Sequence, residues 1–317
     1  MGYSLIKRTT YCLAAVFAAG IIVASGFIRC GLCSATGNSF HLGIGFSTRG
    51  HPNANLEDAR AAVSLLTRKI VDRNSWTGES HSYDSLAEME RDIRDKRAQL
   101  LGLQADEYLE LRKKVPIDPI MLTIGDRGFE FGLLLLVRKD SGIRSLRDLK
   151  NRSIVVTKRS SQYGNLNHVW LETLLLREGI RESNRFFTTV KEVQTVKQVV
   201  MPVFFRQADA CIVTRQVFEL SAELNPQLGK QLTAIARIDN LAPGIIVIDR
   251  RLPDDIRQKI RQTLLTLHEA PDGQQLLMLF QVRKLVPFKP EYLKATEALF
   301  SEYRERDRLM AKQGKRR

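Results

Sequence analysis

Cysteine is scarce in this chain, and its placement leaves it few roles. Three of the four cysteines, Cys12, Cys30 and Cys33, lie in or beside an apolar N-terminal stretch. A cut after Ala35 would leave Cys211 alone, so no disulfide could form within the remaining chain. The C-x-x-C pair at the N-terminal end has no second pair further along, which argues against a zinc or redox site.

Sequence signatures of metal sites and of common enzymes are also missing. The histidines are scattered and show no H-E-x-x-H or comparable spacing: His41, His51, His81, His168 and His268. There is no G-x-S-x-G, no phosphate-loop lysine motif and no complete G-x-G-x-x-G. We therefore expect no metal, no cofactor and no hydrolase or nucleotide-dependent enzyme.

Length and composition indicate a globular protein with two lobes. At 317 residues the chain exceeds one ordinary core, and its 44% apolar and 26% charged residues are typical of folded proteins. The net charge of +14 would suit a nucleic-acid or membrane-surface binder, but basic residues are interspersed with acidic ones, as over residues 88–97. We expect solvated helix faces and no nucleic-acid partner; only the tail, residues 312–317, is a basic cluster.

The N-terminus has the pattern of an export signal. A Lys-Arg pair precedes an apolar run over residues 11–28, and small residues precede a cleavage site after Ala35. The run also approaches the roughly 20 apolar residues that can span a bilayer, so an uncleaved anchor remains open. Residues 1–35 are expected to be a signal peptide or an N-terminal anchor, with the folded part in the periplasm or cell envelope.

Segments with strand and helix patterns alternate along the rest of the chain. The expected strands are residues 40–46, 80–83, 98–103, 117–124, 129–137, 153–157, 186–190, 208–213 and 243–249. The expected helices are residues 56–73, 85–96, 106–113, 164–178, 193–206, 253–268, 272–280 and 291–308. This alternation predicts an α/β fold with mostly parallel sheets.

Two of these strands are expected to connect the lobes. The run at 129–137 should leave the first lobe, and the run at 243–249 should return to it. Residues 38–136 plus 238–317 would then form lobe 1, and residues 141–236 would form lobe 2. The C-terminal helices are expected to pack on lobe 1.

Candidate ligand-binding residues follow the strands, because ligands of open α/β sheets bind beyond the carboxyl ends of strands. This rule selects Ser47, Thr48, Arg49, Tyr83, Gln104, Ser160, Ser161, Gln162, Tyr163, Gly164 and Arg215. The loop at 160–164 joins a buried strand to a helix start, where unpaired N–H groups and the helix dipole attract an anion. Two alternatives remain open: the serines serve only as helix caps, and Tyr83 and Tyr163 are core or rim packing residues.

The order of these parts resembles type II periplasmic binding proteins, in particular the phosphate, phosphite and phosphonate binders of ABC importers. The resemblance rests on residues 143–150, 153–157, 160–164 and 208–213, with further landmarks at 108–113, 224–230 and 252–257. The family's anion loop, Ser-Thr-Ser-Gly, falls on residues 161–164, which keep its first serine and its glycine. The family's histidine at the next helix start is replaced; its position falls near Thr195 or Val196.

The resemblance implies a two-lobed periplasmic-binding-protein fold of type II, with mixed, mostly parallel sheets and flanking helices. It implies an exported protein that captures a small anion, similar to phosphate or phosphonate, in an interlobe cleft for uptake by an ABC permease. A membrane-anchored sensory or accessory module with the same fold remains an alternative. An enzyme similar to thiamine-precursor synthases would need a catalytic histidine or lysine in the cleft, and the missing histidine argues against it.

Overall fold

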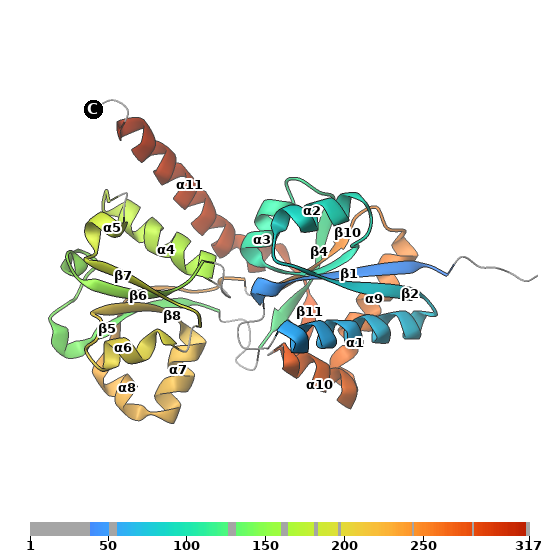
Figure 1. Cartoon of the computed structure of the whole chain (residues 1–317), viewed down its shortest axis with the longest axis horizontal. Coiled ribbons are helices and arrows are strands. Elements are labelled where there is room, and N and C mark those ends of the chain that lie inside the picture. The colour runs from blue at the N-terminus through green and yellow to red at the C-terminus, as the bar shows by residue number, and fades with distance from the viewer. Residues whose placement is uncertain are drawn as a thin grey trace, which may run out of the picture. The chain divides into compact units, whose positions relative to one another are not determined.

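The computed structural model describes residues 39–50, 56–125, 131–159, 164–180, 183–195, 198–242, 244–280 and 282–314. These residues form two mixed α/β sheets, each with helices on both faces (Figure 1). No helix within these ranges is long and apolar enough to cross a bilayer. The predicted signal or anchor at 1–35 lies outside the described residues.

The first sheet has six strands in the order β11-β4-β10-β3-β1-β2. They are β1 (His41–Ser47), β2 (Thr77–Tyr83), β3 (Leu100–Gln104), β4 (Ile117–Ile124), β10 (Gly244–Asp249) and β11 (Lys284–Pro287). Strand β1 is parallel to β2 and β3, whereas β10 is antiparallel to its neighbours β3 and β4, and β11 to β4.

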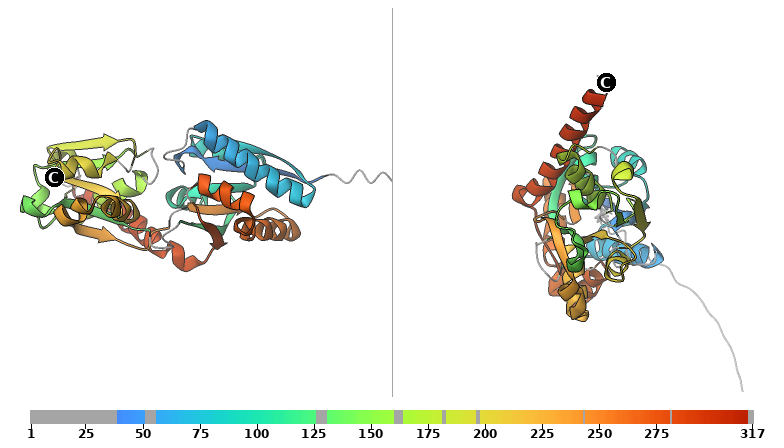
Figure 2. Two further views of the ribbon diagram at one scale, coloured as in Figure 1. Left: turned by 90° about the horizontal axis from the view of Figure 1, so that it is seen from below. Right: turned by 90° about the vertical axis from the view of Figure 1, so that its left-hand side faces the viewer.

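Five helices cover the two faces of the first sheet. Helices α1 (Leu56–Asn74), α9 (Asp254–Leu265) and α10 (Pro271–Leu279) lie on one face, and α1 and α10 are neighbours (Figure 2). Leu42, Ile44 and Phe46 of β1 point to this face, as the period of two in a strand requires. Helices α2 (Leu86–Arg94) and α3 (Ala105–Leu111) cover the other face (Figure 1). We call this unit lobe 1.

The second sheet has five strands in the order β7-β6-β8-β5-β9. They are β5 (Leu133–Arg138), β6 (Ser153–Thr157), β7 (Thr189–Val193), β8 (Ala210–Thr214) and β9 (Leu232–Ile238). Helices α4 (Gly164–Arg177) and α5 (Ser183–Phe186) lie on one face, and α6 (Val200–Phe204), α7 (Arg215–Leu224) and α8 (Pro226–Gln231) lie on the other (Figure 1). We call this unit lobe 2.

The lobe boundaries differ from those predicted. Strand β5 pairs with β8 on one side and β9 on the other, so residues 133–136 belong to lobe 2. Ile238 pairs with Leu133 and also belongs to lobe 2. The apolar run that was expected to end lobe 1 is instead an inner strand of the second sheet, because all six of its residues are buried between two neighbours.

The two mixed sheets with flanking helices confirm the predicted fold class, with antiparallel strand pairs slightly outnumbering parallel ones. Among the described residues four strand pairs are parallel and five are antiparallel. Strands β5 and β10 account for four of the antiparallel pairs, since each enters its sheet from the other lobe in the reverse direction. The strand expected at 186–190 is replaced by the end of α5 and by β7, and the helix expected at 193–206 is reduced to α6.

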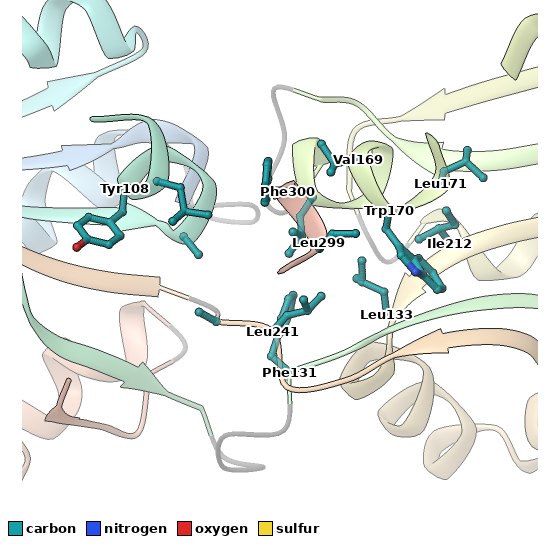
Figure 3. Close-up of a cluster of buried hydrophobic side chains, with 14 of the residues drawn as sticks. Tyr108, Phe131, Leu133, Val169, Trp170, Leu171, Ile212, Leu241, Leu299 and Phe300 are labelled. Carbon is teal, nitrogen blue, oxygen red and sulfur yellow. The ribbon is translucent and has the colours of Figure 1, made fainter. Parts of the chain in front are cut away.

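The last helix, α11 (Lys294–Gly314), contacts both lobes, which corrects the expectation that the C-terminal helices pack only on lobe 1. Leu299 and Phe300 of α11 belong to one buried cluster together with Tyr108 of α3 and Trp170 of α4 (Figure 3). Thr296, also on α11, accepts a hydrogen bond from the backbone N–H of Ala242, which follows β9 (2.9 Å). The apolar core is therefore continuous from lobe 1 to lobe 2 through α11.

Candidate functional site

A polar cluster lies at the carboxyl ends of the parallel strands β1 and β3. Ser47 ends β1, and Gln104 ends β3 and precedes the first turn of α3. Both donate to the buried carboxylate of Glu107: the Ser47 hydroxyl to Oε1 at 2.7 Å, and the Gln104 backbone N–H to Oε2 at 2.9 Å. The second bond caps α3, because the carboxylate pairs with an N–H that precedes the helix.

Arg49 joins this cluster through two carboxylates. It lies in the short 3-10 helix η1 (Thr48–Gly50), with Nη1 3.2 Å from Glu107 Oε1 and Nη2 3.2 Å from Asp106 Oδ2. The two acidic side chains are only 7% and 1% exposed. Burial, and then the charge of Asp106, raise the pKa of Glu107, while Arg49 and the hydrogen bonds oppose that rise. The positive charge of Arg49 is therefore offset within the cluster itself.

A second polar group lies in lobe 2, where β6 ends and α4 begins. The buried Asn167 donates from Nδ2 to the Thr157 hydroxyl at 2.7 Å, and His168 Nε2 donates to the Thr157 carbonyl at 2.9 Å. Burial, and then the charge of Arg159, lower the pKa of His168, so its imidazole is neutral. Asn167 Oδ1 is buried and has no hydrogen-bond partner among the described residues. The first turn of α4 also presents backbone N–H groups without partners in the helix.

The polar groups of the two lobes meet through side chains on either side of residues 160–163. Asn165, in the first turn of α4, donates from Nδ2 to Asp106 Oδ2 at 2.8 Å. Arg49 Nη2 lies 3.4 Å from the carbonyl oxygen of Arg159, which directly precedes those residues. The segment at 160–163 therefore has both of its flanks in contact with lobe 1.

The predicted site residues fall into several groups. Ser160, Ser161, Gln162 and Tyr163 lie outside the described residues, and Gly164 is the first residue of α4. Ser47, Arg49 and Gln104 come together around Glu107. Thr48 lies beside them and donates from its hydroxyl to Asp84 Oδ1 at 2.6 Å.

Tyr83 belongs to the interior of lobe 1. Its side chain is 2% exposed, and its hydroxyl donates to Asp92 Oδ2 at 2.9 Å. The absent side chain of Gly45 makes room for the ring, since a Cβ atom there would lie 2.7 Å from a ring carbon of Tyr83. The contacts of this phenol are therefore with the fold of lobe 1.

The two remaining predicted residues contact other parts of lobe 2 and its connections. The backbone N–H of Thr195 donates to Gln198 Oε1 at 3.2 Å. Arg215 starts α7, with Nη1 3.6 Å from Asp239 in the segment between β9 and β10. Its backbone N–H donates to the Gly132 carbonyl at 2.9 Å, so it contacts both connections between the lobes.

Sequence reasoning did not select four polar residues that the structure places in the cluster: Asp84, Asp106, Glu107 and Asn165. One signal was available, because Gln104 and Glu107 have the three-residue spacing of a capping box directly after a strand. In the ranges that the structure describes, there is no group of three or more His, Cys, Asp or Glu residues able to hold a metal ion.

Two α/β lobes with mixed sheets, connected by crossover segments, define the fold class of type II periplasmic binding proteins. Residues 51–293 match the model of a family described as the periplasmic substrate-binding proteins of phosphonate ABC transporters. The chain belongs to this family. A comparison with curated proteins gives no match.

Solved structures with the same fold include three bacterial proteins. A binding protein component of an ABC phosphonate transporter from Pseudomonas aeruginosa is 15% identical, with TM-score 0.60 over 85% of this chain and 88% of its own. A Xanthomonas citri protein bound to ATP is 17% identical, with TM-score 0.63 over 84% and 98%. PhnD1 from Prochlorococcus marinus, in complex with methylphosphonate, is 16% identical, with TM-score 0.58 over 83% and 97%.

Proposed function

We propose that this protein is exported and captures a small oxyanion of the phosphonate or phosphate type, which it delivers to an ABC permease. One observation carries the proposal: both flanks of the predicted anion loop contact the polar cluster of lobe 1. Asn165 bonds to Asp106, and the Arg159 carbonyl bonds to Arg49. A ligand bound by this loop would touch both lobes. Family membership supports the same role, as does the methylphosphonate bound to the Prochlorococcus marinus protein.

The expected position of the anion follows from electrostatics. In lobe 1, the Arg49 guanidinium is already paired with Asp106 and Glu107, so this side has no excess of positive charge to offer an anion. In lobe 2, the first turn of α4 presents unpaired N–H groups and the positive end of a 14-residue helix. We therefore place the oxyanion against Ser161 and Gly164, with the remainder of the ligand facing lobe 1.

Capture would then work by a shift of population. A ligand that contacts both lobes binds the closed arrangement better than the open one and so increases its share. The closed form is the one that a permease would recognise. An anchored sensory module would use the same capture step, and the long apolar run at 11–28 is the observation that favours this second role.

Calorimetric titration with methylphosphonate, phosphite and phosphate tests the proposal. Ser161→Ala should weaken binding about tenfold or more, because a hydrogen bond to a charged group contributes about 1.5 to 3 kcal/mol. Gly164→Val should weaken it further by crowding the approach to the backbone. Ser301→Ala, an exposed serine on α11, is the matched control and should leave affinity unchanged.

Denaturant melts of the same variants separate binding from helix capping. If Ser161 only caps α4, its replacement by alanine lowers stability by about 1 kcal/mol and leaves affinity unchanged. Wild-type affinity in both loop variants, for an oxyanion that the protein does bind, would exclude the loop as the anion site. Failure of every oxyanion to bind would overturn the proposed ligand class.

A further inference from the structure

The hydrogen bond between Asn165 and Asp106 joins the two lobes at the candidate site, beside the longer contact of Arg49 Nη2 with the Arg159 carbonyl oxygen (3.4 Å). Asp106 is the second residue of α3 in lobe 1, and Asn165 is the second residue of α4 in lobe 2. Asn165 Nδ2 donates to Asp106 Oδ2 at 2.8 Å. We propose that Asp106 and Asn165 form an interlobe latch that holds the lobes together in the absence of ligand.

The local environment makes this bond stronger than an ordinary surface contact. The acceptor is a carboxylate, and hydrogen bonds to an ionised group are about twice as strong as neutral ones. The Asp106 side chain is only 7% exposed, so little water competes for its oxygens. Since the bond can exist only when α3 and α4 approach each other, it stabilises the closed arrangement and no other.

Both halves of the latch are held in position by further contacts. In lobe 1, Arg49 binds the same Oδ2 of Asp106 at 3.2 Å. In lobe 2, Asn165 Oδ1 accepts from Arg159 Nη1 at 3.3 Å, which orients the amide so that Nδ2 faces Asp106. Arg159 in turn bonds to Glu172 of α4. The two side chains therefore lose little conformational entropy when the latch forms.

The network continues from the latch to α11. Burial, and then a hydrogen bond to Glu172, raise the pKa of Tyr303 to about 12. The Tyr303 phenol therefore stays protonated near neutral pH and can remain a donor to the carboxylate that binds Arg159. The half of the latch that lies in lobe 2 is thus linked to α11, the helix that packs on both lobes.

The latch has a consequence for ligand binding, and this step rests on the proposed function. The apparent affinity of a ligand that requires the closed form scales with the fraction of protein already closed. A latch that favours closure raises affinity without touching the ligand. Asp106 and Asn165 are positioning residues in this sense, and their loss should weaken every ligand of the site by a similar factor.

Hydrogen–deuterium exchange of the full chain without ligand tests the latch directly. Asn165→Ala should speed exchange of backbone amides at 104–107, which lie in the other lobe. Asp106→Ala should do the same for amides at 165–168. About tenfold faster exchange is expected, which corresponds to 1.4 kcal/mol. Asp72→Ala, an exposed aspartate on α1, is the matched control and should change neither segment.

The double variant completes the test, because substitutions of two residues in direct contact have non-additive effects. Its backbone amide exchange across the lobes should match that of the single variants. Additive effects in the double variant, or unchanged exchange across the lobes in both single variants, would overturn the latch. Asn165 lies on a partly exposed helix face, so Asn165→Ala should fold. This variant keeps the test valid should Asp106→Ala fail to fold.

Titration with methylphosphonate then separates the two proposals. A roughly tenfold loss of affinity in Asn165→Ala, with faster exchange in lobe 1, supports both. Faster exchange with no methylphosphonate binding even to the wild type leaves the latch in place and removes the proposed ligand. Unchanged exchange with normal binding overturns the latch and leaves the proposed function.

Discussion

Glu302 of α11 provides a sharp test of how this helix is attached to lobe 2. Its two carboxylate oxygens accept from Nε and Nη2 of Arg177 on α4, both at 2.8 Å, and Arg306 adds a bond of 2.7 Å. The hydrogen bonds from Arg177 are the main cause that lowers the pKa of Glu302 from 4.5 to about 2. We predict that Glu302→Gln destabilises the protein at neutral pH.

The expected loss of stability follows from the pKa shift of Glu302, reduced to allow for screening by water. A change from 4.5 to about 2 would correspond to about 3 kcal/mol at 1.36 kcal/mol per unit. The side chains of Arg177 and Arg306 are 45% and 39% exposed, however, so water screens the pair. Exposed pairs contribute about 0.2 to 1 kcal/mol, and we expect about 1 kcal/mol for this bidentate one.

The pH dependence has a definite sign. A carboxylate whose pKa is lowered in the folded state stabilises the fold at pH values above its unfolded pKa. This contribution is complete above pH 4.5 and is lost as the pH falls towards 2. The stability difference between wild type and Glu302→Gln should therefore be largest at neutral pH and should shrink steadily below pH 4.5.

Urea unfolding at a series of pH values measures this difference. Fluorescence of Trp170 is a suitable probe, since this buried residue packs in the cluster that contains Leu299 and Phe300 (Figure 3). Glu305→Gln removes an exposed carboxylate from the same helix and should have little effect at any pH. Equal midpoints for the two variants at neutral pH, or a difference that persists in acid, would refute the reasoning.

Two further predictions concern buried polar groups. Tyr83→Phe should cost about 1 to 2 kcal/mol in urea melts, because Asp92 loses a buried donor at 2.9 Å, yet it should leave oxyanion affinity unchanged; a selective loss of affinity would instead place the phenol at the ligand. Burial raises the pKa of the Cys211 thiol, so iodoacetamide should modify Cys211 only after denaturant is added, as judged by peptide mass mapping; rapid modification of the folded protein would contradict this.

Much of the secondary structure could be predicted because local patterns determine it. Strand β4 and strand β6 begin and end at the predicted residues, and α4 begins at the predicted Gly164. These segments combine an apolar run with clear turn residues on either side. Segments whose structure depends on a partner strand carry no such local signal: β9 and β11 were not predicted, and both are edge strands bound to one neighbour.

The apolar run that became β5 shows a different limit. Its continuous apolar residues correctly indicate burial on both faces, but burial does not say in which sheet a strand lies. Only pairing with β8 and β9 assigns it to lobe 2. The same limit explains why the direction of its pairing could not be foreseen.

Prediction of the candidate site was limited in the same way. The rule for strand ends selected Ser47, Arg49 and Gln104, which the structure does bring together. It missed Asp106, because an acidic residue in a first helical turn is already explained by the helix dipole. The contact of Asp106 with Asn165 spans 59 positions, and no local pattern in one sequence encodes such a pair.

The place of β10 in the first sheet sets the order in which the lobes can be completed. Lobe 2 takes its five strands from one stretch of chain, Leu133 to Ile238, so its sheet can close as soon as that stretch is available. In the first sheet β10 lies between β3 and β4, and until residue 249 is present that sheet exists only as two unjoined fragments. A chain that is released or cut before this point would carry a complete second sheet beside a divided first sheet, with the unpaired edges of β3 and β4 open to other chains.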